Sequence, residues 1–206
     1  MPGVIAYAYL TRPIVERWGR QWLDGGTIQV RFLKPVYDGD DLSAALNEEG
    51  EVGLRNASGE LCVAGEAAPA GQADSPEAGG EPLRPIVAQL SEEAALAHLE
   101  LVSETLPIYR RQKLAHPGWL LSLANDVLIE NIKPTTPWLH VESTVGNLAA
   151  AAWGQEVRVG GRLASRYERR GHRFCDLDLL FEASGRPLVR MMHRAIYELR
   201  PPSPER

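Results

Sequence analysis

Residues 30–42 read VRFLKPVYDGDDL, and the strand and turn in this stretch decide the fold. From Thr27 to Leu33 apolar and polar letters alternate, which predicts a strand with one buried face. Pro35 and the Gly39-Asp40 pair then end the strand, because Pro cannot donate to a ladder and Gly and Asp favour turns. A segment with apolar residues near helical spacing precedes the strand, so the predicted order is helix, strand, turn.

The same order returns 115 residues further on, without a gap over about forty residues. At that offset Pro2-Gly3 matches Pro117-Gly118, Val30 matches Val145, Leu33 matches Leu148 and Gly39 matches Gly154. A later turn, NASGE at 56–60, matches EASGR at 182–186 with an offset of 126, which implies 11 additional residues in the second copy. We place this insertion in the turn around 167–174. The chain is therefore predicted to hold two copies of one module.

Each copy runs from Pro-Gly into a helical pattern and then into several strand patterns. In the second copy the helical pattern ends at Pro134 and Pro137. In the first copy Pro13 falls inside the pattern, which predicts a kink or a restart of the helix there. The strand patterns are 27–33, 41–46, 51–56 and 60–67 in the first copy, and 139–145, 156–167, 173–182 and 187–199 in the second. One helix and an antiparallel sheet, present twice, predict an α+β fold in which each sheet wraps its helix.

A change in composition separates the two copies. Residues 68–85 combine Ala, Gly, Pro and acidic residues without apolar periodicity, which is typical of a solvated linker. We therefore predict a first repeat over 1–70, a linker over 71–84, a second repeat over 85–200 and a tail over 201–206.

The helix followed by VRFLKPVYDGDDL resembles the MaoC-like (R)-specific enoyl-CoA hydratases and 3-hydroxyacyl-thioester dehydratases, which have the hot-dog fold. Residues 90–109, LSEEAALAHLELVSETLPIY, resemble the short helix and loop that end in Asp-x-Asn-Pro-x-His in this family. The resemblance covers nearly the whole chain outside the linker. It implies a double hot-dog whose first copy lacks the strand and loop that precede the central helix.

The resemblance also implies a site. Aligned on Pro107, the catalytic Asp of the family falls on Glu104 and its His falls on Tyr109, so both ends of the catalytic pair are substituted. His116 is a further candidate proton carrier, or alternatively a residue that caps and orients the loop. In the family the amino end of the central helix would polarise the thioester carbonyl, which assigns that role to the Gly118 and Trp119 region.

Other polar residues are weaker candidates. Coenzyme A phosphates could meet basic side chains of both copies, although a solvated strand face or turn is the simpler explanation for each: Arg31, Lys34, Arg162, Arg166, Arg169, Arg170 and His172. Asn125 and Asp126 could serve a thioesterase or lie exposed on a helix. His140 and His193 are expected to be packed or hydrogen-bonded within strands. The two cysteines, Cys62 and Cys175, are expected to be buried free thiols, and no spacing indicates a metal site.

The predicted function is binding of an acyl-CoA, with reversible addition of water to a 2-enoyl thioester and reduced or lost activity. A thioesterase and a non-catalytic subunit that completes a hydratase-like partner remain alternatives. No cofactor is expected beyond the coenzyme A thioester itself. A net charge of -5, 44% apolar residues and the absence of a long apolar run or signal peptide predict a cytoplasmic protein that binds neither nucleic acid nor membrane. The missing part of the first copy favours a homo-oligomer or a hot-dog partner chain.

Overall fold

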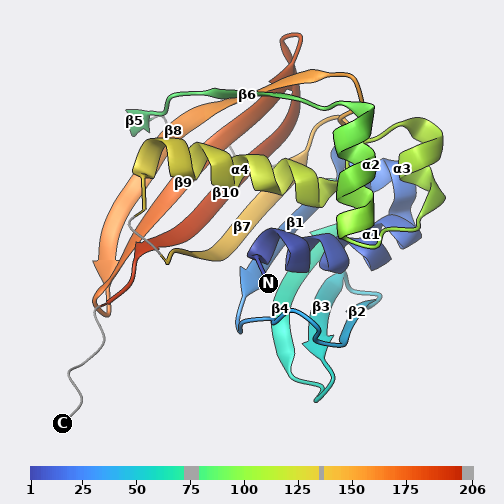
Figure 1. The fold of residues 1–206 in the computed structure, drawn as a ribbon, viewed down its shortest axis with the longest axis horizontal. Coiled ribbons are helices and arrows are strands. Elements are labelled where there is room, and N and C mark those ends of the chain that lie inside the picture. The colour runs from blue at the N-terminus through green and yellow to red at the C-terminus, as the bar shows by residue number, and fades with distance from the viewer. Residues whose placement is uncertain (72–78, 135–136, 201–206) are drawn as a thin grey trace.

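The computed structural model describes residues 1–71, 79–134 and 137–200, which form one antiparallel sheet covered on one face by helices (Figure 1). Within these residues the sheet has ten strands in the order β2-β3-β4-β1-β7-β10-β9-β8-β5, and β6 also pairs with β8. The strands are β1 (Thr27–Phe32), β2 (Leu42–Leu46), β3 (Glu51–Asn56), β4 (Leu61–Ala68), β5 (Glu81–Pro82), β6 (Ile86–Gln89), β7 (Leu139–Asn147), β8 (Glu156–Arg169), β9 (His172–Ala183) and β10 (Arg186–Glu198). The helices are α1 (Gly3–Gly25), α2 (Glu92–Leu101), α3 (Pro107–Gln112) and α4 (Pro117–Ile132).

The two repeats meet at the pairing of β1 with β7. Thr144 lies 115 residues after Gln29, and these two residues face each other in the ladder. On either side, Thr27 pairs with Gly146 and Arg31 with Glu142, so exchanging the repeats at this offset reproduces the same pairing. The strand order is also symmetric, with β2-β3-β4-β1 on one side and β7-β10-β9-β8 on the other. The predicted duplication is therefore confirmed as a pseudo-twofold axis through the centre of one continuous sheet.

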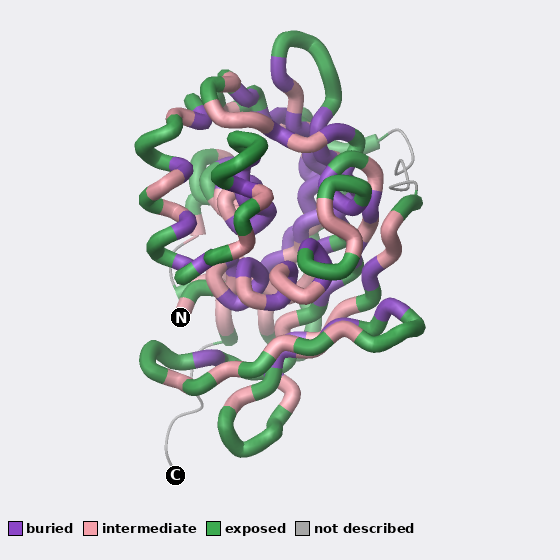
Figure 2. The backbone as a smooth tube through the Cα atoms, turned by 90° about the vertical axis from the view of Figure 1, so that its right-hand side faces the viewer, coloured by how far each residue is buried: buried purple, intermediate pink, exposed green. Residues whose placement is uncertain are grey.

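Alternation along β1 explains which face of the sheet the helices cover. Ile28 and Val30 are buried toward α1 and α4, whereas Gln29 and Arg31 point to the opposite, outer face. The same period of two continues in β9, where Leu177 and Leu179 are fully buried. In Figure 2 the buried segments accordingly lie where the helices and the sheet face each other.

Helix α1 does not break at Pro13, as the sequence predicted. The break lies at Gly19, whose φ of 54° and ψ of -131° are not helical. Proline removes one hydrogen bond but leaves the α conformation possible, whereas this combination of angles is open almost only to glycine. The helix therefore changes direction six residues later than predicted.

The central helices α1 and α4 pack against each other at a close approach. A Cβ atom added to Gly118 would lie 2.7 Å from the Cβ of Ala8, so only glycine fits there. Helix α4 ends at Ile132, before Pro134 as predicted, and Lys133 adopts the left-handed conformation that closes it. The described helices include none that is long and apolar enough to cross a membrane.

The additional residues of the second repeat lengthen one hairpin. Strand β8 has 14 residues where β2 has 5, and the turn between β8 and β9 lies at Arg170 and Gly171. Strands β5 and β6, which pair with the outer edge of β8, were not predicted from the sequence. Most of the predicted linker, residues 72–78, and the predicted tail, residues 201–206, lie outside the described residues.

Candidate acid-base site

A helix, a loop and a second short helix carry the candidate residues to the amino end of α4. Helix α2 is capped by Ser91, whose hydroxyl oxygen accepts a hydrogen bond from the Ala94 N–H. Helix α3 begins with Pro107, which suits a first helical position because its missing N–H would have no partner there. Between them lies Glu104, and the chain then enters α4 through His116.

Glu104 is a buried carboxylate with one oxygen fully engaged. Its Oε1 atom accepts hydrogen bonds from the Arg12 guanidinium at 2.7 Å and from the Leu106 N–H at 2.6 Å. The side chain is only 3% exposed. Burial raises the pKa of Glu104, but the contacts with His116, the Leu106 N–H and Arg12 outweigh burial and hold the pKa below its usual value. Glu104 is therefore ionised at neutral pH.

His116 caps α4 and faces Glu104 with its other ring nitrogen. Its Nδ1 atom accepts a hydrogen bond of 3.0 Å from the Gly118 N–H, so the proton of the neutral ring resides on Nε2. The Nε2 atom lies 3.7 Å from Oε2 of Glu104, which is too long for a direct hydrogen bond. Burial lowers the pKa of His116, and Glu104 only partly reverses this effect. The ring is therefore neutral at neutral pH.

Three further polar side chains surround this pair. The hydroxyl groups of Tyr7 and Tyr109 and the Nε2 atom of His98 are buried and have no hydrogen-bond partner among the described residues. The rings of Tyr109 and His98 have their centroids 4.8 Å and 5.3 Å from that of His116. Burial lowers the pKa of His98 to about 4 and raises the pKa of Tyr109 well above its usual value. Neutral donors and acceptors thus surround one carboxylate.

This arrangement has the parts of an acid-base site. Oε2 of Glu104 and Nε2 of His116 face each other, and neither has a direct hydrogen-bond partner among the described residues. A water molecule or a substrate oxygen between them could donate to the carboxylate and accept from the imidazole. Carboxylates and imidazoles are the commonest groups that move protons in enzymes.

The predicted site residues are only partly brought together. Glu104, Tyr109 and His116 form one cluster, as predicted. Gly118 lies beside them, but its N–H is bonded to His116, and the Trp119 N–H donates to the His116 carbonyl at 3.0 Å. Neither amide is free to stabilise an oxyanion in this structure.

Three residues of this cluster, Arg12, Tyr7 and His98, were not predicted from the sequence. Arg12 and Tyr7 lie on the helix of the other repeat, and Arg12 reaches Glu104 across 92 residues of sequence. In the sequence, Arg12 could have been noticed as a single arginine between the apolar residues Leu10 and Ile14, which are both buried in the structure. It lies on the helix that the duplication makes equivalent to α4.

The basic residues predicted for coenzyme A do not converge. Arg31 lies at the end of β1 and pairs with Glu142, and Lys34 pairs with Glu60. The second group, Arg166, Arg169 and Arg170, lies on β8 and its turn, and β7, β10 and β9 separate β8 from β1. The two groups therefore lie on separate parts of the sheet, and phosphate binding by either group stays a prediction.

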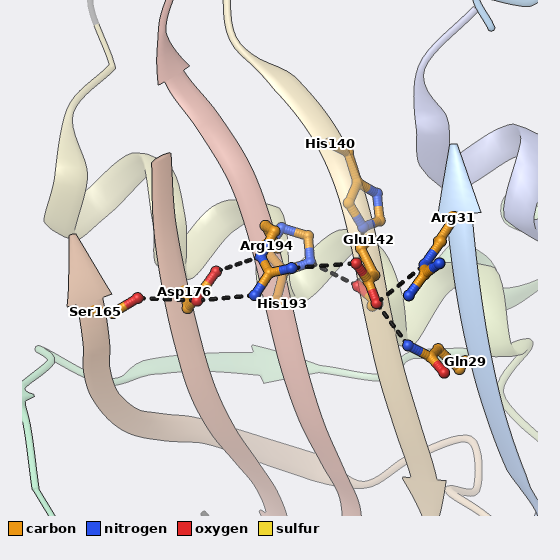
Figure 3. A network of polar contacts seen from close by, with 9 residues as sticks. Gln29, Arg31, His140, Glu142, Ser165, Asp176, His193 and Arg194 are labelled. Atoms are coloured by element: carbon orange, nitrogen blue, oxygen red, sulfur yellow. Dashed lines mark hydrogen bonds and ion pairs between the residues drawn. The ribbon is translucent and has the colours of Figure 1, made fainter. Parts of the chain in front are cut away.

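A network of polar contacts crosses the outer face of the sheet (Figure 3). It begins with the Ser165 hydroxyl, which donates to Asp176, and continues through Arg194 to Glu142 and Gln29. Five strands contribute to it, including β1 and β7 at the boundary between the repeats. This network joins the two halves of the sheet. It also includes Arg31, which forms an ion pair with Glu142.

The remaining candidate residues lie outside the cluster of Glu104 and His116. His140 and His193 both contact the Ser143 hydroxyl, at 2.9 Å and 3.1 Å, beneath the sheet, so the expectation of packed, hydrogen-bonded histidines is confirmed. Asp126 is exposed on α4. Both cysteines are free and buried, as expected. A hollow of about 610 Å³ lies on the outer face of β1–β4, away from Glu104.

Comparisons with known proteins agree with this architecture. No family model and no curated protein matches the sequence. A MaoC-like dehydratase superposes with a TM-score of 0.59 at 12% identity, covering 94% of this chain and 82% of its own. A conserved hypothetical protein from Mycobacterium tuberculosis with a double hotdog fold gives a TM-score of 0.61 at 12% identity, with coverages of 95% and 81%. A Lactobacillus plantarum protein described as an oleoyl thioesterase gives 0.61 at 11%, with coverages of 98% and 84%.

At these identities the likeness defines the fold. The chain is a double hot-dog protein, and the predicted resemblance to MaoC-like dehydratases is confirmed at the level of the fold.

Proposed function

We propose that this chain binds acyl thioesters and slowly catalyses the reversible addition of water to a 2-enoyl thioester. The observation that carries the proposal is the buried pair of Glu104 Oε2 and His116 Nε2, 3.7 Å apart at the start of α4. Support also comes from the fold shared with a MaoC-like dehydratase. Coenzyme A thioesters are the substrates that we expect, with no cofactor in addition.

The proposed mechanism uses one carboxylate. Oε2 of Glu104 accepts a proton from water as the water oxygen bonds to C3 of the enoyl group. The Nε2–H of His116 donates a hydrogen bond that orients this water. Glu104 then returns the proton to C2, so that one water molecule has been added and the enzyme is unchanged. The reverse sequence dehydrates a 3-hydroxyacyl thioester.

Two features make the proposed reaction slow. Arg12 and the Leu106 N–H hold the pKa of Glu104 low, which weakens the carboxylate as a base. The Glu104 and His116 side chains are also only 3% and 1% exposed, so the loop before α3 has to open for a substrate to enter. General acid-base catalysis contributes about 10²–10⁴-fold, and we expect the lower end of that range here.

The test follows crotonyl-CoA and 3-hydroxybutyryl-CoA by the absorbance of the enoyl group. Glu104→Gln keeps an acceptor for Arg12 and Leu106 but removes the base. His116→Asn keeps a cap for α4 and removes Nε2. Both variants should lower the rate about 10²-fold, whereas Glu92→Gln, at an exposed position in the first turn of α2, should leave it unchanged. Equal rates in wild type, Glu104→Gln and His116→Asn would exclude this site.

A non-catalytic acyl-thioester-binding subunit is the second candidate, because the Arg12 ion pair weakens the base. For this candidate, the same experiment would show binding of crotonyl-CoA without any change in its enoyl absorbance. Release of free thiol from an acyl-CoA, measured in parallel, would instead identify a thioesterase.

A further inference from the structure

The two ends of the sheet differ in a way that the pseudo-twofold axis makes visible. Strand β8 ends the second repeat, and its outer edge is paired with β5 and β6. Strand β2 is the equivalent strand of the first repeat and ends the sheet on the other side. Among residues 1–71, 79–134 and 137–200, β2 pairs only with β3. Within the described residues, one edge of the sheet is therefore covered and the equivalent edge is open.

The covered edge shows what kind of segment fits the open one. Strand β6 pairs antiparallel with β8, with Ile86 opposite Val159 and Gln89 opposite Glu156. The Leu83 N–H donates to the Gly161 carbonyl at 3.0 Å, and the Leu90 N–H to the Gln155 carbonyl at 2.8 Å. An extended segment of four to eight residues thus completes this edge through its main chain.

The open edge presents the same set of backbone groups. The Asn47 N–H donates to the Glu51 carbonyl at 2.9 Å, so Asn47 faces β3. Because successive residues of a strand alternate, the backbone groups of Leu42, Ala44 and Leu46 point away from β3. At the offset of 115, Leu46 corresponds to Gly161, whose carbonyl group accepts from Leu83 at the covered edge.

Acidic side chains flank the open edge at both ends. The carboxylates before and after β2 are exposed, and none of them makes an ion pair within the described part of the chain: Asp38, Asp41, Glu48 and Glu49. An antiparallel pair of two β2 strands would bring the aspartates of one copy to the glutamates of the other. Like charges placed opposite each other across strands are destabilising, so a second copy of this acidic chain is disfavoured here.

We propose that the open edge of β2 binds an extended segment of another protein that carries lysine or arginine at both ends. The segment adds one strand to the sheet, as β6 does at the other end. Main-chain hydrogen bonds to Leu42, Ala44 and Leu46 hold it, and the flanking carboxylates select for positive charge. This inference does not depend on the proposed hydratase activity, because β2 and Glu104 lie in different parts of the fold.

The test uses three labelled synthetic peptides and fluorescence anisotropy at low salt. The first alternates threonine and valine between two lysines at each end. The second has glutamates in place of the lysines, and the third is the lysine peptide with alternate backbone nitrogens methylated on its pairing edge. We expect the lysine peptide to bind about tenfold or more tightly than either of the other two.

Ala44→Pro tests the edge from the side of the protein. Proline removes the outward N–H but not a bond to β3, so the hairpin should fold, as circular dichroism and thermal unfolding will check. The Ala44→Pro variant should bind the lysine peptide about tenfold more weakly than the wild-type protein does. Ala44→Ser keeps the N–H and should bind this peptide as the wild type does. The inference is wrong if the lysine peptide fails to bind or binds Ala44→Pro and wild type alike. It is also wrong if the protein is a dimer that Ala44→Pro converts to a monomer.

Discussion

At the scale of single residues, four of the five histidines lie where burial keeps their rings neutral. Burial lowers the pKa of His193 and of His98 to about 4, and it also lowers the pKa values of His116 and His140. In the unfolded chain these side chains bind a proton near pH 6.5. Between pH 6.5 and 4 the unfolded state therefore binds more protons than the folded state, so stability falls as the pH falls through this range.

His193→Asn tests this pH dependence. His193 is fully buried, and its Nδ1 atom contacts the Ser143 hydroxyl, a contact that asparagine can replace. Loss of this histidine should reduce the fall in the free energy of unfolding between pH 7.5 and 5 by roughly 2 kcal/mol, measured by urea denaturation. His172→Asn, at the turn of the β8–β9 hairpin, is the matched control. An identical pH dependence in wild type and His193→Asn would contradict the assignment of a buried neutral ring.

At the scale of elements, the close contact of α1 with α4 connects the candidate site to the fold. His116 caps α4, Arg12 extends from α1 to Glu104, and both depend on the approach of the helices at Gly118. A methyl group at this position would lie 2.7 Å from Ala8. The spacing between α1 and α4 therefore also sets how far Arg12, from the first repeat, lies from His116, from the second.

Gly118→Ala should destabilise the protein by about 1–3 kcal/mol, because the added methyl group overpacks the contact between the helices. Adding Ala8→Gly should recover part of this loss, although glycine alone costs about 1 kcal/mol inside a helix. Urea denaturation of the two single variants and the double variant measures the coupling between the two positions. If the two effects simply add, the helices do not meet at these residues.

At the scale of the whole molecule, the sequence predicted the fold better than the site. Residues matching at one offset and the alternation of strand residues were enough to predict two modules, and Thr144 opposite Gln29 confirms the offset. The site depends on contacts between repeats, such as that of Arg12 with Glu104, which no local pattern reports. Strand β6 was missed because its pairing with β8 depends on tertiary contacts more than on local propensity, and the kink was assigned to Pro13 although the backbone angles that it needs are those of glycine, at Gly19.

The proposed hydratase function requires the buried Glu104 carboxylate to carry a proton from water to carbon. NMR of crotonyl-CoA incubated with the protein in D₂O measures this directly, because each hydration places one deuterium at C2 of the 3-hydroxyacyl product. We predict slow incorporation by the wild-type protein and a rate about 10²-fold lower with Glu104→Gln. Incorporation at the same rate by both proteins would contradict the assignment of Glu104 as the base.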